Sequence, residues 1–321
     1  MILGALLVTL VGFLVISELG LRLFFKSRLR FVQDERSMLY RYDSVLGWFP
    51  PTNTTNVFAA SRPITVIHNS QGFRDIEPVT NSHPAILFVG DSFVWGYDVE
   101  ASERFTDKLR AKHPEWNVFN LGVSGYGTDQ ELLLLQMNFQ KYAPRLVVLI
   151  YSTDTDDDDN SSNARYGDYY KPYCRVAGDK LLMEGVPVPR SERAFLAEHR
   201  GLARSYLLRL VIRAWFKFTA PPVMQNPSPT DAIIRTMNKY VSEQGAYFVV
   251  GLTQTNSVID KFFQHYKIPF IDLDTSLRYP SYGKHWTPAG HDVVCERIEK
   301  YILENGLLAQ PASNSKTAVH E

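Results

Sequence analysis

The stretch AILFVGDSFVWG, residues 85–96, decides the fold. Apolar and small residues run without a polar interruption to Gly90, and Asp91 and Ser92 follow at once. A short, continuous apolar run is typical of a strand buried on both faces, as in a parallel sheet covered by helices. The sequence therefore predicts a strand over 85–90, with Ser92 just beyond its carboxyl end.

Four more segments of this kind follow along the chain: WNVFNLG (116–122), RLVVLIY (145–151), AYFVVGL (246–252) and IPFIDLD (268–274). Between and after them, helical patterns occupy residues 103–113, 128–142, 229–244, 256–266 and 287–306. Strands that alternate with helices predict an α/β fold. We expect a flavodoxin-like, three-layer α/β/α architecture around a mainly parallel five-stranded sheet.

The domain organisation follows from these patterns. We predict a membrane anchor over residues 1–25 and an N-terminal segment extended along the core over 26–80. An α/β domain follows over 81–310, with one long insertion at about 155–228, and residues 311–321 form a loose tail. The insertion contains Gly178-Asp179, which favours a hairpin, and a helix over 205–218. That helix is apolar on one side and basic on another, so it is either an ordinary packed helix or a lid or membrane-surface element.

The N-terminal apolar run over residues 2–17 has the length of a signal anchor. No basic segment precedes it and no small-x-small cleavage site follows, so we expect a retained transmembrane helix; a buried core helix is the alternative. The basic residues that follow the run, Arg22, Lys26, Arg28 and Arg30, favour a cytoplasmic catalytic domain by the positive-inside rule.

Composition excludes several classes of protein. Lys plus Arg and Asp plus Glu both number 34 in 321 residues, so the net charge of zero gives no reason to expect a nucleic-acid partner. Cys174 and Cys295 predict neither a disulfide framework nor a zinc site, although a single bridge stays open. The acidic run from Asp154 to Asp159 lacks the alternation and glycine of a calcium loop. We therefore expect a solvated loop there, and no metal or cofactor.

Ser92 lies where open α/β sheets place their ligands, beyond the carboxyl ends of the strands. A nucleophilic serine needs a base, and KHWTPAGHDVV (284–294) places His285 in a loop before a helix, from which an imidazole can reach a strand end. His291 lies inside that helix and is expected to pack. The alternative for Ser92 is a helix cap formed with Asp91.

Three motifs together, GDSF (90–93), NLGVSGYG (120–127) and HWTPAGH (285–291), resemble those of the GDSL, or SGNH, hydrolases over residues 81–305. NSQGFRD (69–75) also resembles a feature of anchored members. The resemblance implies the SGNH hydrolase fold, with Ser92 as nucleophile, Gly122 as an oxyanion-hole donor through its N–H, and His285 as base.

The sequence departs from the family at two places. Thr153 or Asp154 stands where the family has an oxyanion-hole asparagine, and an ionised Asp cannot donate a hydrogen bond. The family's acid just before the histidine is also missing, since Tyr282, Gly283 and Lys284 occupy those places. Asp272 and Asp274 are the candidate acids to orient His285, and a Ser–His dyad that uses a backbone carbonyl is the alternative.

These observations predict a membrane-anchored serine esterase that cleaves an O-acyl ester. The alternatives are an O-acetyltransferase that acts on an envelope glycan, and a degenerate glycan-binding or scaffold protein. The expected partners are an ester substrate, with acylated glycans and lipids as candidate classes, and the membrane through the N-terminal helix. Resemblance to anchored family members favours a catalytic domain outside the cytoplasm, against the charge cue.

Overall fold

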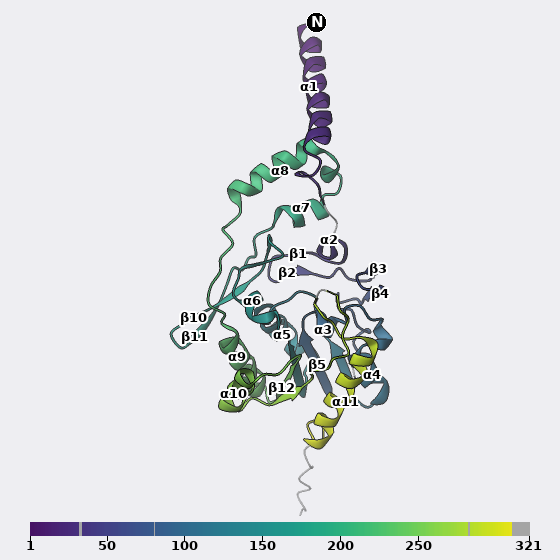
Figure 1. The fold of residues 1–321 in the computed structure, drawn as a ribbon, viewed down its shortest axis with the longest axis vertical. Coiled ribbons are helices and arrows are strands. Elements are labelled where there is room, and N and C mark those ends of the chain that lie inside the picture. Colours follow the sequence, from purple (N-terminus) through teal and green to yellow (C-terminus); the bar gives the residue numbers. More distant parts are fainter. Residues whose placement is uncertain (32–33, 80, 282, 310–321) are drawn as a thin grey trace, which may run out of the picture.

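A five-stranded parallel sheet forms the centre of the protein (Figure 1). The computed structural model describes residues 1–31, 34–79, 81–281 and 283–309. The sheet order is β13-β12-β7-β5-β6, and every neighbouring pair is parallel. The strands are β5 (Ala85–Gly90), β6 (Asn117–Asn120), β7 (Leu146–Tyr151), β12 (Tyr247–Leu252) and β13 (Phe270–Asp272). All five predicted strands are confirmed.

Two layers of helices cover the sheet, as predicted. Alternate residues of β5 enter separate cores: Leu87 and Val89 pack with the α5 and α9 side, and Ile86 and Phe88 with the α4 and α11 side. The helices are α4 (Phe105–Lys112), α5 (Thr128–Tyr142), α9 (Thr230–Glu243), α10 (Ser257–Tyr266) and α11 (Pro288–Glu304). A strand buried on both faces needs apolar residues at every position, which explains the continuous run.

The order of the strands positions the site. The chain runs from β5 outward to β6 and then returns to the other side of β5 to form β7. The carboxyl end of β5 therefore lies where the strand order reverses, and loops on either side diverge there to leave a crevice. Ser92 follows β5 at this point.

The N-terminal region is a projecting helix followed by small elements that pack on the domain (Figure 1). Helix α1 (Ile2–Phe24) has no buried residue and is long and apolar enough to cross a membrane. The segment predicted as extended instead forms a short helix and two hairpins: α2 (Glu35–Leu39), β1 (Arg41–Asp43) with β2 (Gly47–Phe49), and β3 (Thr54–Ala59) with β4 (Pro63–His68). Trp48 and Phe58 bury their rings in the main core, which fixes these hairpins.

The insertion between β7 and α9 reaches from the sheet to the foot of α1 (Figure 1). Its elements are α6 (Asp156–Asn160), β8 (Ala164–Arg165), β9 (Tyr169–Tyr170), β10 (Tyr173–Ala177), β11 (Lys180–Glu184), α7 (Glu192–Glu198) and α8 (Tyr206–Thr219). The hairpin at Gly178-Asp179 is confirmed. The prediction of a solvated acidic loop is wrong, because residues 156–160 are helical and the buried Asp156 accepts the N–H of Ser152 at 2.9 Å.

Short 3-10 turns, η1 (Ala101–Glu103) and η2 (Leu202–Arg204), complete the described elements. The tail predicted over 311–321 lies outside the described residues, and so does Tyr282. Cys174 and Cys295 are both buried and unbridged, so the single disulfide left open by the sequence is not formed.

Candidate active site

A tight turn presents Ser92 at the end of β5. Ser92 is the first residue of α3 (Ser92–Trp95), and the preceding Asp91 caps that helix by accepting the N–H of Phe93 at 2.9 Å. A Cβ atom added to Gly90 would lie 2.5 Å from Cγ2 of Val94, so the turn requires glycine. Because Asp91 is the cap, the alternative role for Ser92 as the capping side chain is not needed.

The structure brings Ser92 and His285 into contact. The Nε2 atom of His285 lies 2.7 Å from the Oγ atom of Ser92, although 193 positions separate them in the sequence. Burial, with the positive charges of Arg278 and Arg165 adding to it, lowers the pKa of His285 to about 3. The imidazole is therefore neutral near pH 7, and a neutral Nε2 can accept the hydroxyl proton.

Among the residues that the structure describes, aromatic side chains rather than a carboxylate hold the His285 ring. Tyr97 stacks on the ring with centroids 4.4 Å apart, and Phe93 lies at 5.1 Å. The Nδ1 atom of His285 is buried and has no hydrogen-bond partner among the described residues. The proposed backbone-carbonyl partner is therefore not present there either.

Asp272 and Asp274, the candidate orienting acids, lie elsewhere. Their side chains are 57% and 50% exposed. The Asp272 carboxylate accepts the N–H of Asp274 and lies near Arg297, and the Asp274 carboxylate pairs with Arg278. His291 is buried and its Nδ1 accepts the N–H of Phe105 at 3.3 Å, which confirms its packing role.

Of the three predicted oxyanion-hole residues, one faces the crevice. The N–H of Gly122 donates to Oδ1 of Asn120 at 2.9 Å. Both the N–H and the hydroxyl of Thr153 meet Oγ1 of Thr253, at 3.2 and 3.3 Å. Asp154 lines the crevice, where its carboxylate accepts from Gln254 at 2.8 Å. Gly122 and Thr153 stay predictions, since either would have to exchange its present partner to donate to a substrate.

The crevice over Ser92 is a cavity of about 410 Å³ that three parts of the chain enclose. Helix α2 contributes Glu35, and the insertion contributes Thr155, Arg165 and Tyr166. The full lining consists of Glu35, Asp91, Ser92, Phe93, Tyr97, Ser124, Ser152, Asp154, Thr155, Arg165, Tyr166, Gly283, Lys284 and His285. No aliphatic side chain is among them.

The sequence alone did not predict Glu35, Tyr97, Ser124, Ser152 or the three insertion residues of this lining. Ser124 lies within the NLGVSGYG motif and Tyr97 lies five positions after Ser92, so closeness in sequence was an available signal for both. No local pattern points to Arg165, because a long-range fold places the insertion over the crevice.

Several buried or partly buried acids lie near Ser92. Burial raises the pKa of Asp91 to about 6 and that of Asp159 to about 7, although Arg165 contacts Asp159 at 2.7 Å. Burial also raises the pKa values of Glu131 and Asp156 well above the ordinary range. Within the described residues, no three His, Cys, Asp or Glu side chains gather in a group that could hold a metal ion.

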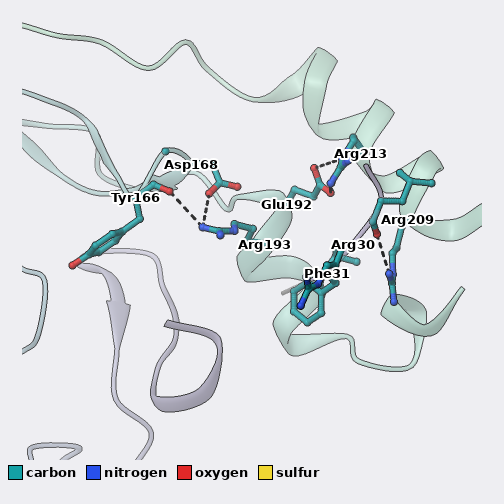
Figure 2. Close-up of a pocket in the computed structure, with 11 residues that line it drawn as sticks. Arg30, Phe31, Tyr166, Asp168, Glu192, Arg193, Arg209 and Arg213 are labelled. Atoms are coloured by element: carbon teal, nitrogen blue, oxygen red, sulfur yellow. Dashed lines mark hydrogen bonds and ion pairs between the residues drawn. The ribbon is translucent and has the colours of Figure 1, made fainter. Parts of the chain in front are cut away.

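A second cavity, of about 280 Å³, lies toward α1 and is shown in Figure 2. Basic side chains dominate its wall: Arg30, Arg193, Arg209 and Arg213. Tyr166 lines both this cavity and the crevice over Ser92.

No family model and no curated protein matches the sequence. Solved structures similar to this one include TesA, with 13% identity over 70% of this chain and 99% of that chain (TM-score 0.41). A lipase/acylhydrolase from Enterococcus faecalis has 15% identity over 69% and 96% of the two chains (TM-score 0.40). A GDSL-like lipase from Bacteroides thetaiotaomicron has 13% identity over 72% and 93% (TM-score 0.36).

Proposed function

We propose that the protein is a membrane-anchored serine ester hydrolase of the SGNH type. The observation that carries this proposal is the 2.7 Å contact between Oγ of Ser92 and Nε2 of a neutral His285 inside an accessible crevice. A nucleophile and base within hydrogen-bond distance are the minimum that acyl transfer to serine requires.

The reaction takes two steps. The Ser92 oxygen attacks the acyl carbonyl while His285 takes the hydroxyl proton, and His285 then returns that proton to the alcohol as the C–O bond breaks. Water attacks the acyl-serine in the second step and gives its proton to His285. The acid leaves and the proton returns to Ser92, so both residues are regenerated.

We propose Ser124 and Ser152 as donors to the oxyanion. Both hydroxyls line the crevice. Ser124 accepts from Arg36 at 3.2 Å and Ser152 accepts from Thr155 at 3.0 Å, so each hydroxyl retains its own proton for donation. These donors would replace the asparagine that this chain lacks.

The lining of the crevice favours a short acyl group on a polar alcohol. A long acyl chain needs apolar wall, whereas this cavity offers three aromatic rings among charged, hydroxyl and glycine residues. We therefore propose an acylated glycan in preference to a lipid ester. Glu35 of the N-terminal segment lines this crevice. We therefore also propose that residues 26–80 belong to the catalytic domain together with residues 81–310.

We propose that α1 is a retained anchor. The carboxylate of Glu18 accepts hydrogen bonds from the Ser205 hydroxyl and from the N–H groups of Tyr206 and Leu207, each at 2.9 Å. A signal sequence that is removed has no reason to cap a helix of the mature protein. We place the catalytic domain outside the cytoplasm; alkaline phosphatase fused after Glu321 should then be active, and activity of a cytoplasmic fluorescent reporter alone would contradict this topology.

Hydrolysis of short-chain p-nitrophenyl esters tests the chemistry. Ser92→Ala and His285→Ala should each abolish turnover while circular dichroism stays unchanged. Ser242→Ala and His265→Ala make the same chemical changes at exposed positions of α9 and α10 and should leave the rate unaltered. Equal turnover by wild type and Ser92→Ala, across acyl lengths and acetylated glycans, would support the non-catalytic alternative.

A further inference from the structure

Helix α8 exposes its apolar side. Residues Val211, Trp215 and Phe218 recur at helical spacing and are 59%, 66% and 84% exposed, and Leu208 beside them is exposed as well. No residue of α8 is buried. A surface helix of a soluble domain normally packs such a stripe on the core. Helix α8 packs on the protein through another side, so the expected solvated face is apolar rather than polar.

The side of α8 that faces the protein carries Arg209 and Arg213 together with Phe216, whose ring lies 5.8 Å from that of Phe195. Figure 2 shows Arg209 and Arg213 extending from α8 toward α7 and the chain that follows α1. Arg209 donates to the carbonyl oxygen of Leu29 at 2.9 Å, and Arg213 pairs with Glu192 at 3.1 Å. These contacts fix the rotation of the helix, so its apolar stripe is held outward and cannot turn to the core.

The same helix is joined to the end of α1. Glu18 caps the first turn of α8, and Arg22 donates to the carbonyl oxygen of Arg204 at 2.8 Å. The apolar run over residues 2–17 spans about 24 Å at 1.5 Å per residue, most of the roughly 30 Å hydrocarbon layer. Glu18 is the first charged residue after that run. Figure 1 shows α8 beside the end of α1, so an α1 that spans the apolar layer would place the start of α8 where that layer ends.

Charge gathers at this junction. Residues 18–31 and 199–219 hold nine Lys and Arg residues against one acid, Glu18, while the whole chain has a net charge of zero. A basic belt beside an apolar helix face is typical of elements that lie on anionic lipid. Trp215, on the outward stripe, is also a residue type enriched at membrane interfaces.

We propose that α8 lies in the membrane interface beside α1, with Leu208, Val211, Trp215 and Phe218 immersed in a leaflet that contains anionic lipid. The helix thereby fixes the distance and tilt of the catalytic domain above the membrane. This inference rests on the membrane anchoring proposed for α1 and is independent of the ester chemistry.

The test places an NBD fluorophore on single introduced cysteines of the full chain in vesicles of phosphatidylcholine and phosphatidylglycerol. Val211→Cys and Phe218→Cys report on the stripe, Val15→Cys in α1 is the immersed reference, and Val258→Cys, 76% exposed on α10, is the aqueous reference. The native cysteines are buried, and labelled wild type gives the background. Because an interfacial helix buries its apolar face about 5–10 Å into the leaflet, nitroxide lipids should quench positions 211 and 218, as they quench position 15, and should leave position 258 unchanged.

Two outcomes would overturn the proposal. Quenching of positions 211 and 218 by aqueous iodide to the extent seen at 258 would show that the stripe faces water. Protection from both iodide and nitroxide lipid would show that protein, either a second copy or a partner, covers it. Alkaline carbonate extraction distinguishes either outcome from a failure of the α1 anchor, because the chain stays with the vesicles if α1 spans them.

Discussion

Gly283 should control the position of the catalytic base. Its φ is +82°, and a Cβ atom added there would lie 2.4 Å from Cε1 of His285 and 3.0 Å from both ring nitrogens. An ordinary carbon contact begins near 3.4 Å, so in Gly283→Ala the imidazole must move by about 1 Å. Such a movement breaks the 2.7 Å contact with Ser92, because a hydrogen bond does not extend beyond about 3.5 Å.

A misplacement of this size typically costs about a hundredfold in rate. We therefore expect kcat/KM for a short-chain p-nitrophenyl ester to fall about 10²-fold, which corresponds to about 2.7 kcal/mol in the transition state. Alanine at a positive φ also destabilises the fold by about 1–2 kcal/mol. The two effects must be separated to interpret the result.

Gly245→Ala is the matched control. Gly245 has φ +79° and no atom within 4 Å of an added Cβ, so it carries the same backbone strain without a contact. Both variants should lose similar stability in thermal unfolding, and only Gly283→Ala should lose activity. If Gly283→Ala turns over at the rate of Gly245→Ala, the described position of His285 is not the catalytic one.

Four other predictions follow from the crevice and the core. Ser152→Ala should lower kcat about 10²-fold with little change in KM, as for loss of one oxyanion donor, and a KM effect alone would contradict that role. Asp154→Asn should raise kcat/KM, because it removes a negative charge from the crevice, and a loss of activity with intact folding would show that the carboxylate is needed. Because the pKa of His285 is lowered to about 3, kcat/KM should persist at pH 5, where a histidine of pKa 6.5 would have lost about thirtyfold of its neutral form. Lys171→Met should destabilise the protein by about 3–5 kcal/mol in denaturant unfolding, since it leaves the buried Asp129 without its ion-pair partner, and Lys171→Met with Asp129→Leu should recover much of the loss.

The same depressed pKa has a consequence for stability. In the unfolded chain His285 titrates near 6.5, so the unfolded state binds more protons than the folded state between pH 6.5 and about 3. The contribution of neutral, buried His285 to the free energy of unfolding is therefore fully present above pH 6.5. It is lost as the pH falls from 6.5 to about 3. His291, also lowered to about 3 by burial, adds to the loss with the same sign.

The sheet and its helices could be predicted because their residues carry the reason for their structure locally. Strand β7 (146–151) is buried on both faces and has no polar position, and α5 (128–142) was predicted to the residue. Ser92 and His285, which the structure brings into contact, were predicted from motifs at a strand end and before a helix. Neither the secondary structure nor the two site residues required knowledge of contacts between distant parts of the chain.

The remaining features depend on partners far away in the sequence. The helix of the acidic run is tied to distant segments, because Asn160 at its end accepts the N–H of Asp129 and donates to the hydroxyl of Thr230. The basic helix α8 faces outward because Arg213 pairs with Glu192 of α7. Tyr97 stacks on the face of the His285 ring, while the Nδ1 atom, where an acid was expected, has no hydrogen-bond partner among the described residues. Periodicity alone assigns an apolar side to α8 but does not say whether protein or lipid covers that side.

Labelling with a fluorophosphonate tests the central claim most directly. The reagent forms a covalent bond only with a serine whose oxygen is activated, and mass spectrometry of the peptides identifies the site. We predict modification at Ser92 alone, strong reduction in His285→Ala, and none in Ser92→Ala. Undiminished labelling of Ser92 in His285→Ala, or no labelling of folded wild-type protein, would contradict a Ser92–His285 dyad.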